Sequence, residues 1–309
     1  MTRTSAGSAR LWAFMAIIGA NIIWGINYVL SKRVVPVSID PSTLTMYRVL
    51  VAAALFWVVS LLYKREKVAR QDLIRMFFAA LFGVAINQFL FISGIAKTTP
   101  VDASIIMTSN PIIVLLLSAA VLGDRITPSK IVGIVIGAAG AISLIAYSGT
   151  ISFGSGTLTG NLLILGNSTA YAFYLVAVKP VMAKYSSITV MKWVFLFGMI
   201  QVLPIGLGPM LSYPILNQPI QVLGDIAFIV IGATFLAYLL TSQALSHIKA
   251  TTISIFAYTQ PVIAGIFSVM LGFDEINAMK IASMVLVFIG VYIASRNSLS
   301  LPLVKSSKK

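Results

Sequence analysis

Ten apolar runs, each about as long as a membrane-spanning helix, divide most of this 309-residue chain. A helix that crosses the hydrocarbon core of a bilayer needs about 20 mainly apolar residues. The runs are continuous in hydrophobicity, without the alternation that marks strands. We therefore predict an all-α membrane protein with ten transmembrane helices, over residues 11–31, 42–63, 73–95, 101–122, 128–147, 158–181, 189–211, 222–245, 250–271 and 278–295.

The composition supports a bilayer environment. Charged residues make up only 10% of the chain and hydrophobic residues 59%, whereas soluble domains carry about a quarter charged residues. A soluble fold of this length would have to expose much of that apolar surface to water. The chain has no cysteine, which excludes disulfides, thiol catalysis and thiolate-bound metals.

The basic residues predict the orientation of the chain. A net charge of +14 would suggest a nucleic-acid partner in a soluble protein, but here the charges lie in short segments between the apolar runs. Such segments face the cytoplasm under the positive-inside rule. With the N-terminus inside, 17 of the 22 Lys and Arg residues fall in inside segments and 4 in outside segments, and Arg48 lies within the second run. We expect both termini in the cytoplasm and no nucleic-acid partner.

The two halves of the chain repeat each other at an offset of 150 residues. Five spans per half is an odd number, so the second half enters the membrane with the opposite polarity. Inverted repeats are typical of secondary transporters, because one unit in two orientations yields inward-open and outward-open states of similar energy. We divide the chain into repeats of residues 1–147 and 148–309. The aligned pairs include Pro111 with Pro261, Ser104 with Ser254, Asp124 with Asp274, Lys130 with Lys280 and Gly140 with Gly290.

Short motifs extend this pattern in a fixed order along the chain: Trp24-Gly25-Ile26-Asn27-Tyr28, then Tyr47-Arg48, then Ala103-Ser104-Ile105-Ile106 before Asn110-Pro111, then Leu122-Gly123-Asp124-Arg125-Ile126. In this order they resemble the drug/metabolite transporter superfamily, in its EamA-type branch with two five-helix units. The chain departs from that pattern at Asp124, where Glu is usual, and at Ser283, where the first repeat has Gly133. The resemblance implies transport of a metabolite and leaves the solute open, because the branch includes exporters of amino acids and many other compounds.

Polar and aromatic side chains at helical spacing predict a central cavity. Polar groups within a bilayer face the bundle interior or a water-filled cavity, because hydrocarbon solvates them poorly. Residues three and four apart share one face of a helix. The candidate substrate-binding residues on such faces are Trp24, Asn27, Tyr28, Arg48, Asn87, Gln88, Ser104, Met107, Thr108, Tyr171, Tyr174, Tyr238, Ser254 and Tyr258.

Each candidate also has a purely structural interpretation. Ser and Thr hydroxyls in such helices often bond to their own backbone, and a buried Tyr can simply pack. Arg48 is equally consistent with an anchor that extends toward the outer surface and with a ligand for a carboxylate or phosphate. Pro111 and Pro261 each remove a mid-span backbone hydrogen bond; we predict hinges there, with packing shape as the alternative.

Acidic residues are missing from the middle of every predicted span. A proton-coupled exporter of organic cations usually needs a buried carboxylate, so that mechanism is disfavoured. The single histidine, His247, cannot form a metal site alone, and no catalytic constellation is visible in the sequence. We expect no metal site, no cofactor and no enzymatic activity.

The sequence favours an alternating-access secondary transporter that moves small polar metabolites, above all amino acids or related compounds. The resemblance and the compact loops indicate a bacterial inner membrane, and the resemblance implies export. Nucleotide sugars and drug-like cations are alternative solutes. A membrane-embedded lipid-modifying enzyme and a channel are alternatives from other classes. Membrane lipids are the expected partners beside the solute, and the protein is expected to be a monomer or a homodimer.

Overall fold

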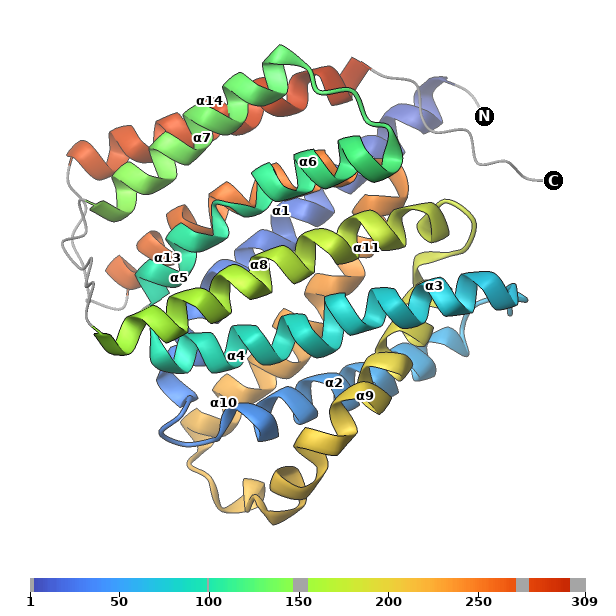
Figure 1. The fold of residues 1–309 in the computed structure, drawn as a ribbon, viewed down its shortest axis with the longest axis vertical. Helices are drawn as coiled ribbons and strands as arrows, with labels where there is room; N and C mark the ends of the chain where they lie inside the picture. Colours follow the sequence, from blue (N-terminus) through green and yellow to red (C-terminus); the bar gives the residue numbers. More distant parts are fainter. Residues whose placement is uncertain (1–2, 99, 147–154, 271–277, 301–309) are drawn as a thin grey trace.

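The computed structural model describes residues 3–98, 100–146, 155–270 and 278–300, and every regular element in these ranges is helical (Figure 1). The elements are α1 (Arg3–Val34), α2 (Pro41–Ser60), α3 (Arg70–Ala80), η1 (Leu81–Ile86), α4 (Asn87–Lys97), α5 (Pro100–Met107), α6 (Asn110–Leu122), α7 (Pro128–Ala146), α8 (Ser155–Met182), α9 (Ser187–Ser212), η2 (Ile215–Asn217), α10 (Ile220–Ala227), η3 (Phe228–Leu236), α11 (Ala237–His247), α12 (Ala250–Ile255), η4 (Phe256–Tyr258), α13 (Thr259–Met270) and α14 (Ala278–Ser300).

Seven helical stretches in the described ranges are long and apolar enough to cross a membrane, and three shorter helices are apolar as well. Each stretch falls on one of the ten predicted runs, so the membrane class is confirmed and the count of ten spans stays a prediction. The seven are Ala9–Val34, Pro41–Ser60, Arg70–Lys97, Leu158–Met182, Ser187–Ser212, Ile220–His247 and Ala250–Phe267, and the shorter three are Asn110–Leu122, Pro128–Gly140 and Ile281–Ala294.

The fourth run is not one continuous helix, in contrast to the prediction. α5 ends at Met107, a turn follows, and α6 begins at Asn110. In the ninth run the 3₁₀ turn η4 separates α12 from α13. Proline has no N–H to donate to the carbonyl four residues earlier, so Pro111 and Pro261 disfavour a continuous helix at these points. Both prolines therefore lie near the start of a new helical segment rather than in mid-helix, and their role as hinges stays a prediction.

The third and eighth runs each contain a π-helical segment that hydropathy does not reveal. η1 divides α3 from α4, and η3 divides α10 from α11. Within η3 the hydroxyl of Thr234 donates to the carbonyl of Ile229, five residues earlier, at 2.9 Å. Such turns shift the register of the backbone ladder and are frequent at functional sites.

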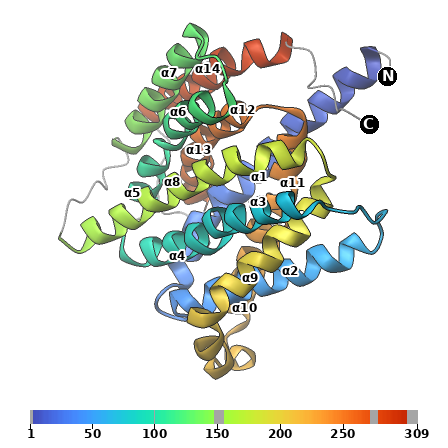
Figure 2. The same ribbon diagram turned by 45° about the vertical axis from the view of Figure 1, so that its right-hand side comes forward.

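Helices from the two halves pack against each other throughout the bundle. α7 lies along α14 at one edge and α2 along α9 at the other, as both views show (Figures 1 and 2). Between these pairs, α4 packs on α8 and α1 on α11, while α6 also contacts α8 and α13 contacts α1. The first helix of each half, α1 and α8, is thus surrounded by helices of both halves.

Ion pairs lie at both ends of the bundle. The starts of α1 and α3 and the end of α14 lie on one side (Figure 1), where Lys184 Nζ is 3.0 Å from Asp72 Oδ1. On the opposite side Arg33 of α1 forms a two-pronged ion pair with Asp225 of α10. Near the first side, burial raises the pKa of Glu66, but hydrogen bonds from Thr189 and Ser186 outweigh it and hold the pKa below its usual value.

Candidate functional site

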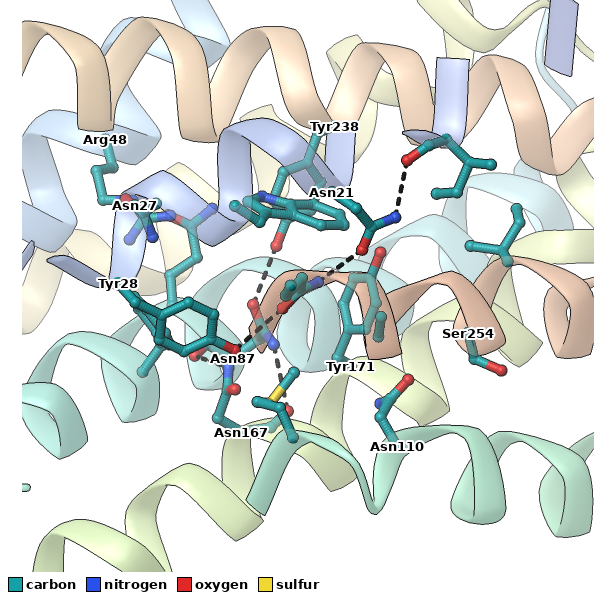
Figure 3. A pocket seen from close by; sticks show the side chains of 18 residues that line it. Asn21, Asn27, Tyr28, Arg48, Asn87, Asn110, Asn167, Tyr171, Tyr238 and Ser254 are labelled. Carbon is teal, nitrogen blue, oxygen red and sulfur yellow. Dashed lines mark hydrogen bonds between the residues drawn. The ribbon is translucent and has the colours of Figure 1, made fainter. Parts of the chain in front are cut away.

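A cavity of about 60 Å³ lies in the interior of the bundle (Figure 3). A cavity needs at least roughly 10–15 Å³ of such space to hold one water molecule, so this conformation has room for a few. Its walls combine residues of α1, α2 and α4 to α6 from the first half with residues of α8 and α11 to α13 from the second. The cavity therefore lies where the two halves meet.

Most of the predicted site residues line this cavity. Those that do are Trp24, Asn27, Tyr28, Arg48, Asn87, Gln88, Met107, Tyr171, Tyr238 and Ser254. The other four are buried beyond its lining. Tyr174 packs behind Tyr171 and Tyr238, with ring centres 5.8 and 6.1 Å away, and Tyr258, Ser104 and Thr108 are buried elsewhere in the bundle. Substrate contact by any of these residues stays a prediction.

Trp24 fixes one wall of the cavity. Its ring meets Tyr171 edge to face at 5.7 Å and Tyr238 at 5.9 Å between ring centres, a geometry that aromatic pairs favour. Its indole N–H donates to the carbonyl of Ala233 at 3.0 Å. Ala233 belongs to η3, so the π-helical segment supplies the acceptor that orients the indole.

Asn87 is the centre of a hydrogen-bond network between α4, α8 and α11. Its side-chain N–H₂ donates to the carbonyl of Asn167 at 3.2 Å, and the amide of Asn167 donates back to the carbonyl of Asn87 at 2.8 Å. The hydroxyl of Tyr238 donates to the side-chain oxygen of Asn87 at 3.0 Å and also lies 2.8 Å from the carbonyl of Gly83. These exchanges hold both amide side chains in single orientations at the cavity wall (Figure 3).

A second chain of hydrogen bonds joins α1 to α13. The hydroxyl of Tyr28 donates to the side-chain oxygen of Gln260 at 3.1 Å. The amide nitrogen of Gln260 donates to Asn21 at 2.7 Å, and Asn21 donates to the carbonyl of Ile17 at 2.7 Å. Each polar side-chain atom of Tyr28, Gln260 and Asn21 thus has a hydrogen-bond partner within the protein.

Arg48 is the charged group of the cavity. Its side chain is only 3% exposed, its Nε–H donates to the hydroxyl of Thr234 at 2.8 Å, and its guanidinium carbon lies 5.9 Å from the ring centre of Phe91. Its Nη1 has no hydrogen-bond partner among the described residues. Of the two interpretations that the sequence left open for Arg48, an anchor that extends to the outer surface does not fit this burial against η3 and α4, and contact with a solute stays a prediction.

Four amide side chains of the lining were not among the predicted residues: Asn21, Asn110, Asn167 and Gln260. Two signals in the sequence point to them. Asn21 and Asn167 each lie one helical turn before a predicted site residue, Trp24 and Tyr171 respectively, and Asn110 aligns with Gln260 at the 150-residue offset. The orientation of the Asn167 side chain depends on the packing of α8 against α4.

The cavity is suited to non-covalent binding of a small polar molecule. None of its lining residues, all within the described ranges, is Asp or Glu. In the same part of the chain there is no group of three or more His, Cys, Asp or Glu side chains that could hold a metal ion. The lining supplies one guanidinium, several carboxamides and tyrosine hydroxyls, and the aromatic faces of Trp24 and Phe91.

Comparisons with known proteins agree with this architecture. The EamA-like transporter family matches the chain twice, over residues 11–146 and 158–296. A protein of Archaeoglobus fulgidus named as an uncharacterized transporter is 29% identical over 88% of this chain and 95% of its own length. A Bacillus subtilis protein named as the uncharacterized transporter YyaM is 24% identical over 91% of this chain and 93% of its own length, and a WAT1-related protein of Arabidopsis thaliana is 22% identical over 93% and 82%.

A solved crystal structure has the same fold. It superposes with a TM-score of 0.73 at 19% sequence identity and covers 94% of this chain and 97% of the other.

Proposed function

This chain belongs to the EamA-like transporter family and is a multi-pass membrane transporter, and we propose that it carries small polar solutes by alternating access through the cavity beside Trp24 and Asn87. The observation that supports this most is the polar lining at the junction of the two halves. A lipid-solvated bundle gains nothing from burying amides and a guanidinium, which are costly inside a membrane and mark solute pathways.

We also propose that the halves are inverted repeats with ten spans in all. Three matched features support this. The π-helical segments η1 and η3 occupy corresponding places in the two halves. The broken helices α5–α6 and α12–α13 follow them in each half. Asn110 of α6 donates to the carbonyl of Ser168 on α8 at 2.8 Å, and its counterpart Gln260 of α13 donates to Asn21 on α1.

Amino acids and related compounds are the solutes that we propose first. A cavity of about 60 Å³ accepts a molecule of a few heavy atoms, whereas a nucleotide sugar would require a far larger opening. Drug-like cations are disfavoured, because the cavity lining combines Arg48 with no carboxylate and would repel a buried positive charge.

We propose a bacterial inner membrane as the location and export as the direction of net flux. The clustering of Lys and Arg residues in the segments beside the starts of α1 and α3 supports cytoplasmic termini. Direction is tested by comparing efflux and uptake in cells that express the protein, against cells that carry the empty vector.

Counterflow in proteoliposomes tests the carrier. Vesicles preloaded with a mixed amino-acid pool should accumulate one labelled amino acid with wild-type protein, and Trp24→Ala and Asn87→Leu should lose most of this uptake. Trp12→Ala is the matched control, because Trp12 lies on the same helix and its side chain is 54% exposed. Ohmic leak without saturation, or equal uptake by all three variants, would refute a carrier that uses this cavity.

A further inference from the structure

The cavity carries one positive charge that the protein does not balance. Arg48 is buried, and its one hydrogen bond to a described group goes to the neutral hydroxyl of Thr234. No carboxylate lines the cavity among the residues that the structure describes. A buried charge is costly unless it is paired and hydrogen-bonded, so an anionic group that reaches Arg48 would replace the missing counter-charge.

Unused hydrogen-bonding atoms also lie in the cavity lining on α2 and α4. Arg48 Nη1 and both polar atoms of the Gln88 side chain have no hydrogen-bond partner among the described residues, although each residue is at most 3% exposed. Buried polar side chains nearly always find partners in folded proteins. These three partnerless atoms on two lining residues are therefore positions where a ligand can bond.

The cavity lining also offers two acceptors, on α6 and α8. The side-chain oxygens of Asn110 and Asn167 also have no partner among the described residues. Each nitrogen already donates to a main-chain carbonyl, of Ser168 and Asn87 respectively, both at 2.8 Å, so the unused atom of each amide is an oxygen. Figure 3 shows Arg48 and Asn110 at opposite ends of the labelled group.

We propose that the cavity is a two-ended site for a carboxylate-bearing molecule. The carboxylate binds Arg48 and the amide nitrogen of Gln88, and a hydrogen-bond donor elsewhere on the molecule, an ammonium or a hydroxyl, binds the oxygens of Asn110 and Asn167. This inference rests on the proposed carrier function and names its solute class. A carboxylate fits better than a phosphate, because a single Arg balances one negative charge and a phosphate monoester carries about 1.5 to 2.

The binding affinities of four small compounds test each end of the site in the wild-type protein. 4-Aminobutanoate and 4-hydroxybutanoate carry both groups, butanoate lacks the donor, and 1-aminobutane lacks the carboxylate. Calorimetric titration of detergent-solubilised wild type should give the tightest binding for the first two. A hydrogen bond to a charged group changes affinity by about tenfold or more, so 1-aminobutane should bind at least about tenfold more weakly than 4-aminobutanoate.

The two compounds with both groups identify the donor. Tighter binding of 4-aminobutanoate would assign an ammonium, and tighter binding of 4-hydroxybutanoate an uncharged donor. In either case butanoate should bind several-fold more weakly than the better of the two, because the oxygens of Asn110 and Asn167 would lose their partner.

Two variants assign the ends to residues. Arg48→Gln should remove the advantage of 4-aminobutanoate over 1-aminobutane, and Arg70→Gln, which removes the same charge from the exposed start of α3, should retain it. Asn110→Leu should remove the advantage of the hydroxy acid over butanoate and leave the carboxylate preference intact. Each ratio is measured within one variant, so a loss of folded protein does not imitate the effect.

The possible outcomes separate this site from the carrier function. Equal binding of 1-aminobutane and 4-aminobutanoate by wild type, or no binding of any of the four compounds, would overturn the two-ended site. The carrier would still stand if counterflow of another solute were observed. Selective binding without counterflow of any solute would instead uphold the site and refute the carrier.

Discussion

Gly83 gives the sharpest test of how the cavity wall is held. It lies in η1, and its carbonyl accepts from the hydroxyl of Tyr238. A Cβ atom added at this position would lie 2.2 Å from Cδ2 and 2.3 Å from Cγ of Tyr174. Ordinary contacts begin at 3.4 Å, so Gly83→Ala requires the ring or the helix to move by roughly 1.2 Å.

The ring of Tyr174 has little room to move. It is 1% exposed and packs against the rings of Tyr171 and Tyr238. Overpacking of a buried position costs about 1–3 kcal/mol, and replacing Gly by Ala in a helix returns up to about 1 kcal/mol. Because the ring is enclosed, we take the upper part of the overpacking range, about 3 kcal/mol, and subtract the gain of about 1 kcal/mol in helix propensity. We therefore expect Gly83→Ala to lower the free energy of unfolding by about 2 kcal/mol.

Reversible unfolding in mixed detergent micelles measures this change. Gly265→Ala is the matched control, because a Cβ atom there meets nothing within 4 Å and should stabilise the helix by about 0.5–1 kcal/mol. In a double-mutant cycle, Tyr174→Ala should make Gly83→Ala less harmful by about 1 kcal/mol or more. Equal stability of the two glycine variants, or strict additivity in the cycle, would refute the close-packing argument.

Three further changes follow from other contacts. Gly290→Ala should destabilise the protein by about 3 kcal/mol relative to Gly265→Ala, because the new Cβ would lie 2.3 Å from a backbone nitrogen of α7; the same unfolding assay measures it. Trp24→Phe should cost about 1 kcal/mol, the typical value of one hydrogen bond, because the bond to the η3 carbonyl is lost, whereas an unchanged midpoint would contradict it. Arg33→Ala should cost more stability than Asp225→Asn, because it leaves a carboxylate that is 9% exposed without its partner, whereas the Arg33 side chain, 52% exposed, can hydrate when Asp225 is replaced; unfolding at low and high salt checks the order.

Hydropathy alone predicts where the helices of this protein lie, because lipid imposes a length and an apolar composition on every span. The described helical stretches begin and end within about five residues of the predicted runs, except at the start of α1, which begins at Arg3 rather than at Leu11. Interruptions inside a helix are harder to predict from the sequence. Pro111 and Pro261 indicate that a backbone hydrogen bond is missing, but the position of each break depends on which neighbouring helix can satisfy the freed backbone groups. The π-helical segments depend wholly on such contacts, as the acceptors in η3 for Trp24 and Thr234 illustrate.

The cavity residues also divide into those that the sequence predicts and those that depend on tertiary packing. Aromatic and polar side chains one helical turn apart could be predicted, because helical periodicity alone places them on one face, and Trp24 and Tyr28 do line the cavity. Burial depth cannot be predicted from helical periodicity, and Tyr174 and Tyr258, which the same periodicity places on the predicted faces, are buried outside the lining of this cavity. For Arg48 the sequence left two alternatives, and only the packing of α2 against η3 decides that the guanidinium stays inside.

Aligned positions in the two halves carry different side chains. This difference gives the two ends of the cavity different hydrogen-bonding groups. Gln88 aligns with Tyr238, and Asn110 with Gln260. Gln260 uses both atoms of its amide within the protein, whereas Asn110 keeps an unused oxygen, as does Gln88. A fully symmetric repeat would bind a solute equally well in two opposed orientations. Because the unused groups come mainly from the first half and Arg48 has no counterpart charge in the cavity lining, a solute with unlike ends would be held in one orientation in the proposed alternating-access carrier.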